Sequence, residues 1–248
     1  MEDYSYLGSG IVLIREWNTN SKFDELGNTS AFSIAPQVNT LTLPDHQNPG
    51  GGIQNRVDRV TDWTLNTTWH DINSANLARH TRGVATNVAA ATVTAEPHFA
   101  YKGAWVPLRY PATSVSAVEP AGGGTPYVAG TDYIVDRGML FIPATSSITD
   151  ATSAANIEVD YAHGAIGHVE AAVTAQKFYE VQLHSANEAR SGKRVQVVCH
   201  KVSGGMLESL SLLGDEYAGA SVAQSLTADA SKATGANVSK YFYWNQEN

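Results

Sequence analysis

Residues 56–70 read RVDRVTDWTLNTTWH, a stretch in which two kinds of side chain alternate. Successive residues of a β-strand point to opposite faces of a sheet, so each face collects every second residue. At about 3.3 Å per residue this stretch extends on the order of 50 Å, whereas a common strand covers less than about 20 Å. One face would carry Val57, Thr61, Trp63, Leu65, Thr67 and Trp69, and the other Arg56, Asp58, Asp62, Thr64, Asn66, Thr68 and His70. The stretch predicts a long amphipathic strand with Trp63, Leu65 and Trp69 in the core.

A second long strand is expected over residues 32–43, just before this stretch. Residues 44–55 connect the two strands and read PDHQNPGGGIQN, which is too long for a tight two-residue turn. A long polar loop at the end of a long hairpin can reach a neighbouring subunit. The pair suits the wall of a tube better than a compact sandwich.

The rest of the chain is rich in Thr, Val, Ser and Gly, with the short alternating segments of antiparallel sheet. We expect a mainly β protein with one flanking helix over residues 75–82, capped by Ser74 and ended by Gly83. A second short helical stretch is expected over residues 185–191. The other expected strands cover residues 11–17, 104–109, 114–118, 132–135, 139–142, 157–161, 178–184, 194–202, 206–212 and 241–244.

Residues 91–164 differ in composition and pattern from the chain on either side. They contain prolines, a Gly122-Gly123-Gly124 turn and several short expected strands. We interpret them as a small β subdomain inserted into a main domain formed by residues 1–90 and 165–248. The Ala/Thr-rich stretches 85–94 and 221–237 are interpreted as linkers or surface strands.

The composition limits the classes of function. There are 16 basic and 24 acidic residues, a formal net charge of −8, and no basic run, which argues against sequence-specific DNA binding. The single cysteine, Cys199, lies in an expected strand and is interpreted as a small buried hydrophobic residue. The first ten residues lack a signal-peptide pattern and no apolar run approaches the roughly 20 residues that span a bilayer, so we expect synthesis in a cytoplasm and no membrane.

No motif predicts catalysis, a cofactor or a metal. His163 and His168 flank a turn that could hold a metal, but the pattern is more typical of surface imidazoles. The glycine runs 50–52 and 122–124 lack the Lys-Ser/Thr ending of a phosphate loop. Asp58 and Asp62 would lie some 13 Å apart along a strand, too far to share a proton, so their face is either solvated or lines a channel.

The succession of eight short pieces resembles the major tail tube proteins of long-tailed, siphophage-type bacteriophages. No piece is specific by itself, and the resemblance rests on their order over nearly the whole chain. The pieces are LGNTS (26–30), the glycine-rich loop, WTLNTTWHD (63–71), ANLA (75–78), GTDYIVD (130–136), FYEV (178–181), LSLLGDEY (210–217) and SKYF (239–242).

The resemblance implies a non-enzymatic structural virion protein. Its fold would be an antiparallel β-sandwich or half-barrel with the inserted subdomain on the outside. Six copies would close into a ring, their inner strands would form one barrel around a lumen, and rings would stack helically. The tube would conduct DNA, contact the tape measure, tail tip and tail terminator proteins, and belong to a virion tail assembled in the host cytoplasm. A flexible, non-contractile tail is the type that the resemblance favours.

Two sets of residues follow as candidate sites. DNA moves past a neutral or acidic wall more freely than past a basic one. The lumen-lining candidates are Asp58, Asp62, Asn66 and Thr68, and the candidates for the loop that stacks one ring on the next are Asp45, His46, Gln47, Asn48, Gly50, Gly51, Gly52 and Gln54.

The main alternative is a β-sandwich recognition module, such as a carbohydrate-binding or adhesin-like virion protein. It would explain the aromatic residues and the turn-rich insertion, and it predicts a monomer or a small closed oligomer rather than a tube. An enzyme is a distant third, because it is favoured only by acidic residues that any acidic protein has.

Overall fold

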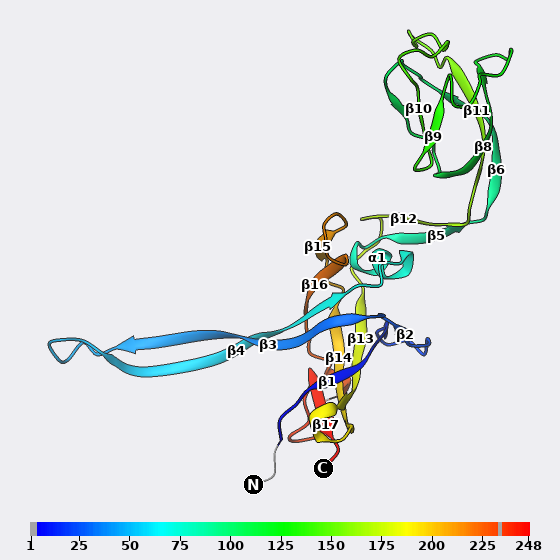
Figure 1. The fold of residues 1–248 in the computed structure, drawn as a ribbon. Coiled ribbons are helices and arrows are strands. Elements are labelled where there is room, and N and C mark those ends of the chain that lie inside the picture. The colour runs from blue at the N-terminus through cyan, green and yellow to red at the C-terminus, as the bar shows by residue number, and fades with distance from the viewer. Residues whose placement is uncertain (1–3, 233–234) are drawn as a thin grey trace. The chain divides into compact units, whose positions relative to one another are not determined.

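The computed structural model describes residues 4–232 and 235–248 (Figure 1). Over these described residues the chain is mainly β, with several antiparallel sheets and a single α-helix, as predicted for the fold class. It divides into two compact units: unit 1 runs up to Ala85 and resumes at Val169, and unit 2 comprises Thr86–His168. The sequence placed these boundaries at residues 91 and 164. Of the Ala/Thr-rich stretch 221–237, residues 233 and 234 lie outside the described residues.

Unit 1 contains two antiparallel sheets. The five-stranded sheet has the order β17 (Phe242–Gln246), β14 (Lys193–Ser203), β13 (Phe178–Asn187), β1 (Gly8–Glu16), β2 (Asp24–Glu25). The four-stranded sheet has the order β15 (Leu207–Ser211), β16 (Gly219–Ser225), β4 (Ile53–Trp69), β3 (Thr29–Pro44). Strand β3 is longer at both ends than the sequence indicated, and β4 begins three residues earlier and ends one residue earlier, so their connection shortens to residues 45–52.

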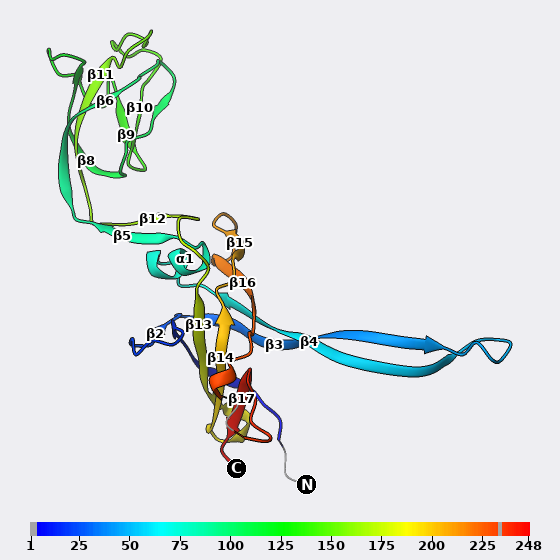
Figure 2. The same ribbon diagram turned by 180° about the vertical axis from the view of Figure 1, so that it is seen from behind.

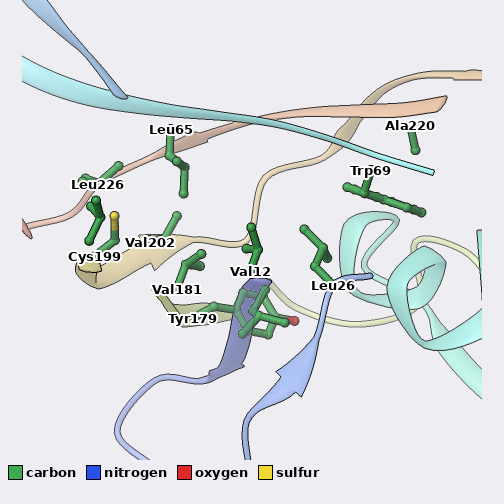
Figure 3. Close-up of a cluster of buried hydrophobic side chains, with 12 residues drawn as sticks. Val12, Leu26, Leu65, Trp69, Tyr179, Val181, Cys199, Val202, Ala220 and Leu226 are labelled. Carbon is green, nitrogen blue, oxygen red and sulfur yellow. The ribbon is translucent and has the colours of Figure 1, made fainter. Parts of the chain in front are cut away.

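The core of unit 1 lies between these two sheets (Figure 3). Leu65 and Trp69 of β4 are fully buried there, as predicted, against residues such as Val181 of the facing sheet. Trp63 is half-buried, and its ring lies 5.1 Å from that of Phe242. Each fully buried apolar side chain of this size contributes roughly 2 kcal/mol through the water it no longer contacts.

Cys199 is fully buried in the same core, as predicted. Burial raises the pKa of its thiol to about 12. The side chain is therefore neutral and acts as a small hydrophobic residue.

Helix α1 (Ser74–His80) is capped by Asn73 rather than by Ser74, and Thr81 rather than Gly83 ends it. Asn73 has extended backbone angles and its side chain accepts from the Asn76 amide at 2.9 Å, which is the geometry of an N-cap. Within the described residues, no helix is long and apolar enough to cross a bilayer.

The helix expected over residues 185–191 is wrong. Strand β13 continues to Asn187, because residues 185–187 pair with Gly8–Gly10 of β1, and only the 3-10 turn Glu188–Arg190 follows.

Unit 2 has its own core and two three-stranded sheets. Their orders are β6 (Ala91–His98), β11 (Ile157–His163), β8 (Ala112–Pro120) and β7 (Trp105–Val106), β10 (Met139–Phe141), β9 (Ile134–Asp136). The core comprises buried residues that include Val118, Leu140, Ile157 and Tyr161. The chain enters and leaves through β5 (Val84–Val88) and β12 (Ile166–Glu170), which pair with each other.

Candidate assembly site

The distal part of the β3–β4 hairpin extends beyond the four-stranded sheet as a two-stranded ribbon (Figures 1 and 2). Strand β16 pairs with β4 only from Thr64 to Trp69, so residues 38–60 contact no third strand of that sheet. We call residues 38–60 the arm. Every residue of the arm is exposed except the half-buried Asp45.

Apolar side chains lie on both faces of the arm. Leu41 and Val57 are opposite each other on one face and are 48% and 45% exposed. Val38 and Val60 are opposite each other on the other face and are 49% and 55% exposed. An isolated two-stranded hairpin is at best marginally stable in water. The arm therefore exposes apolar side chains on both of its faces, and exposed apolar surface of this kind is typical of interaction sites.

A β-bulge lies at the base of the arm. Gln37 is opposite Asp62, but the next residue, Val38, is opposite Val60, so Thr61 has no partner across the ladder. The Thr61 hydroxyl instead donates to the Gln37 carbonyl at 3.2 Å. An extra residue in one strand offsets the alternation of its side chains.

The bulge separates two aspartates that the sequence placed on one face. Asp62 shares a face with Gln37, whereas Asp58 lies opposite Thr40 and hence on the other face. The prediction that Asp58 and Asp62 share one surface is wrong, because strict alternation does not survive the bulge. Asp58 accepts hydrogen bonds from Arg56 Nε (2.9 Å) and Thr40 Oγ1 (2.7 Å), which lower the pKa of its carboxyl.

The structure does bring Asp62, Asn66 and Thr68 together on the outer face of the four-stranded sheet, away from the core. Ser225 Oγ donates to Asp62 Oδ2 at 2.6 Å, and the Thr68 and Ser221 hydroxyls lie 3.2 Å apart. Below the arm, in residues 31–37 of β3, residues 62–68 of β4 and β16, none of the described outward-facing residues is basic, and only Asp62 is charged. They are Ala31, Ser33, Ala35, Gln37, Asp62, Thr64, Asn66, Thr68, Gly219, Ser221, Ala223 and Ser225. This face is small, polar and almost uncharged.

Both edges of this sheet are open within the described chain, because β3 pairs only with β4 and β15 only with β16. Strand β3 presents an edge of 16 residues. A long open edge is a template for pairing with a strand of another chain.

The loop at the tip of the arm is organised by Asp45. Its carboxylate accepts from the Gln47 amide (2.8 Å) and from Asn48 Nδ2 (2.6 Å), and its own amide donates to the Gly52 carbonyl (2.8 Å). Gly50, Gly51 and Gly52 all have positive φ, and an added Cβ would meet no neighbouring atom. Glycine is therefore favoured here by the backbone conformation and not by a lack of space. Of the predicted loop residues, His46 is exposed, and Gln54 lies in β4 rather than in the loop.

Sequence reasoning did not single out the loop between β15 and β16, residues 212–218, as a site. Its Leu213 and Tyr217 side chains are 94% and 96% exposed, more than any other large hydrophobic residue among those described. The only sequence signal is a pair of leucines directly before Gly214. We call residues 212–218 the apical loop.

Unit 2 holds a cluster of titratable side chains with a structural explanation. Tyr161 Oη donates to Glu96 Oε2 at 2.7 Å, and the Arg109 amide donates to Glu96 Oε1 at 3.0 Å. Burial, followed by the bond to Glu96, raises the pKa of Tyr161 to about 12. The cluster joins strand β11 to β6 and to the segment before β8.

The two histidines considered for a metal do not form a site. The His163 ring is buried and lies 4.6 Å from the ring of Tyr110, whereas His168 is exposed. In the described part of the chain, no three His, Cys, Asp or Glu side chains gather as metal ligands would.

The match to a protein family covers almost the whole chain, from residue 5 to residue 245. The chain belongs to the family "Protein of unknown function UCP028589". A comparison with curated proteins gives no match. The family description states no activity, so the function is inferred from the geometry of unit 1.

Proposed function

We propose that this protein is a structural, self-assembling subunit that polymerises into a hollow tube, and that the tube is the DNA conduit of a long-tailed bacteriophage. In this proposal copies form rings, rings stack along the tube axis, and the ligands of each copy are other copies, other tail proteins and passing DNA. No chemical turnover is involved.

The observation that carries the proposal is the arm. It exposes Leu41 and Val57 on one face and Val38 and Val60 on the other. These side chains would contribute hydrophobic free energy only on contact with another molecule. The open edges of the four-stranded sheet add a second mode of association, through backbone hydrogen bonds. An arm for stacking and two edges for lateral pairing are what a subunit of a stacked-ring tube requires.

The outer face of the four-stranded sheet supports the conduit part of the proposal. In our assignment Asp62, Asn66 and Thr68 face the channel, whereas Asp58 lies on the arm, on the face opposite to that of Leu41 and Val57. A wall without basic residues releases no counterions from DNA and so does not retain it. Side-chain hydroxyl and amide groups, such as those of Thr68 and Asn66, keep such a wall hydrated.

The proposal is tested by negative-stain electron microscopy of the purified protein over rising concentration, with sedimentation velocity on the same samples. Rings or hollow tubes are expected, with a sharp onset in concentration. A monomer at every concentration, even after addition of preformed tail tips as seeds, would contradict the proposal.

A row of apolar side chains in unit 2 favours the recognition module as a second candidate. Trp105, Phe141 and Ile134 lie side by side across β7, β10 and β9; Trp105 and Ile134 are 47% and 44% exposed. Exposed aromatic rings beside polar groups suit stacking on a sugar ring. This candidate predicts glycan binding by the full chain that Trp105→Ala abolishes, without any tube.

A further inference from the structure

The two most unusual features of unit 1 lie at opposite ends of the same four-stranded sheet. The tip of the arm is at the end where Pro44 pairs with Ile53. The apical loop is at the other end, where Ala220 of β16 pairs with Trp69. His70 Nδ1 lies 2.9 Å from the Ala218 carbonyl and ties the loop to that end of β4.

The apical loop combines apolar and acidic side chains. The nearly fully exposed Leu213 and Tyr217 stand on either side of Gly214-Asp215-Glu216. A hollow of ≈ 570 Å³ beside Tyr217 is also lined by Asp71. Neither Asp215 nor Glu216 forms an ion pair within the described chain.

One face of the arm has the complementary character. Leu41, Leu43 and Val57 lie on it, each between 45% and 51% exposed. Arg59, opposite Asn39, lies on the same face, is exposed and has no acidic partner among the described residues. The arm's other arginine, Arg56, is already paired with Asp58, at 2.9 Å. This face therefore offers an apolar patch with one free cation.

We propose that the arm of one copy docks on the apical loop of the next copy in the stack. Leu41, Leu43 and Val57 would cover Leu213 and Tyr217, and Arg59 would pair with Asp215 or Glu216. This inference rests on the proposed function and names the contact that propagates the tube. Because the two surfaces differ and lie at opposite ends of the sheet, the contact is head-to-tail and leaves a free arm and a free loop at the two ends of every stack.

Charge reversal tests the contact. Arg59→Glu and the double variant Asp215→Lys/Glu216→Lys each place like charges together, and each should raise the concentration at which tubes form by at least about tenfold. An equimolar mixture should polymerise near the wild-type concentration, because the reversed arm fits the reversed loop on another copy. Pelleting by ultracentrifugation and electron microscopy measure both effects, and circular dichroism checks that each exposed variant is folded.

Arg56→Glu is the matched control, since it makes the same charge change on the other face of the arm. It should shift the onset concentration by less than about twofold. An equal loss of assembly in this control, or a mixture that fails to recover, would overturn the proposed contact while leaving the tube itself in place. A wild-type chain that forms no tube under any condition, seeds included, would overturn the proposed function and this contact with it.

Discussion

The two halves of the β3–β4 hairpin belong to the same pair of strands and differ completely in their surroundings. From Trp63 to Trp69, β4 places every second side chain in the core between two sheets, and Leu65 and Trp69 are fully buried. From Val38 to Val60 the same ribbon is exposed on both faces, apart from the half-buried Asp45. One hairpin therefore passes from a buried sheet into a ribbon that is exposed on both faces.

The difference lies in how the apolar residues are distributed. In the base half, large apolar residues occupy one face and Thr or Asn the other, as a half-buried sheet requires. In the arm, aliphatic residues occur on both faces and alternate with charged ones, so neither face can be left in water without cost. The base half stabilises the fold, whereas in our proposal the arm supplies the surface for association between copies.

The largest expected effect is on the base half. Trp69→Ala should lower the free energy of unfolding by about 3–5 kcal/mol, because it leaves a cavity in the core. Chemical denaturation of the monomer below the onset of assembly measures this. Trp69→Phe is the control: it keeps a ring in place and removes an indole N–H that has no acceptor within the described chain, so its cost should be well under half as large. A small loss for Trp69→Ala would contradict the assignment of the core.

The base half should also respond to pH through His80 of α1, whose buried ring lies 5.6 Å from that of Trp69. Burial, and then the charge of Arg79, lowers the pKa of His80 from 6.5 to about 4. Below pH 6.5 the unfolded chain binds a proton that the folded chain does not bind until about pH 4, so stability is lost as pH falls through this window. At roughly 1.4 kcal/mol per pH unit the loss is at most about 3 kcal/mol.

The measurement is the free energy of unfolding of the wild type and of His80→Phe between pH 7 and pH 4. The phenylalanine variant should show a shallower slope over this range. Parallel slopes for the two proteins would show that His80 is not the group responsible.

A smaller, functional effect is expected on the outer face of the sheet. Asn66→Lys should leave tubes intact but make them bind short duplex DNA, with an affinity that falls as salt rises. Asn245→Lys on β17 of the five-stranded sheet makes the same substitution away from this face and should not. Retention of DNA by pelleted tubes is the readout, and equal retention by both variants would place the channel elsewhere.

The smallest effect on stability is expected in the arm. The double substitution Leu41→Ser/Val57→Ser should change the free energy of unfolding of the monomer by less than about 0.5 kcal/mol, because both side chains are about half exposed and neither belongs to the core of unit 1. The same variant should assemble poorly. A loss of several kcal/mol of monomer stability would mean that the arm belongs to the fold and not to the interface.

The sequence predicted those features that depend on local patterns. The long hairpin, the burial of Leu65 and Trp69, and the single helix follow from alternation and capping residues. The cap itself was misplaced by one residue, because Asn73 and Ser74 are both good caps and the choice depends on a tertiary contact: Asn76 Nδ2 donates to the Leu26 carbonyl at 2.9 Å.

Features that depend on pairing could not be predicted from alternation. The bulge at Thr61 is set by the register between β3 and β4, so Asp58 and Asp62 were assigned to one face when they lie on two. The apical loop was missed because two adjacent leucines at the end of a strand predict more strand. Their exposure follows from where β15 ends, at Ser211, which is a matter of sheet geometry.

The most direct test of the central claim compares the wild type with a chain whose arm is excised, in which Val38 and Val60, opposite each other in the ladder, are joined by Asn-Gly. No residue of the excised segment belongs to the core of unit 1. We predict that the excised chain unfolds at the same temperature as the wild-type monomer and forms no tubes in electron micrographs, whereas the wild type forms them. Tubes of normal length from the excised chain, or its failure to fold, would contradict the account.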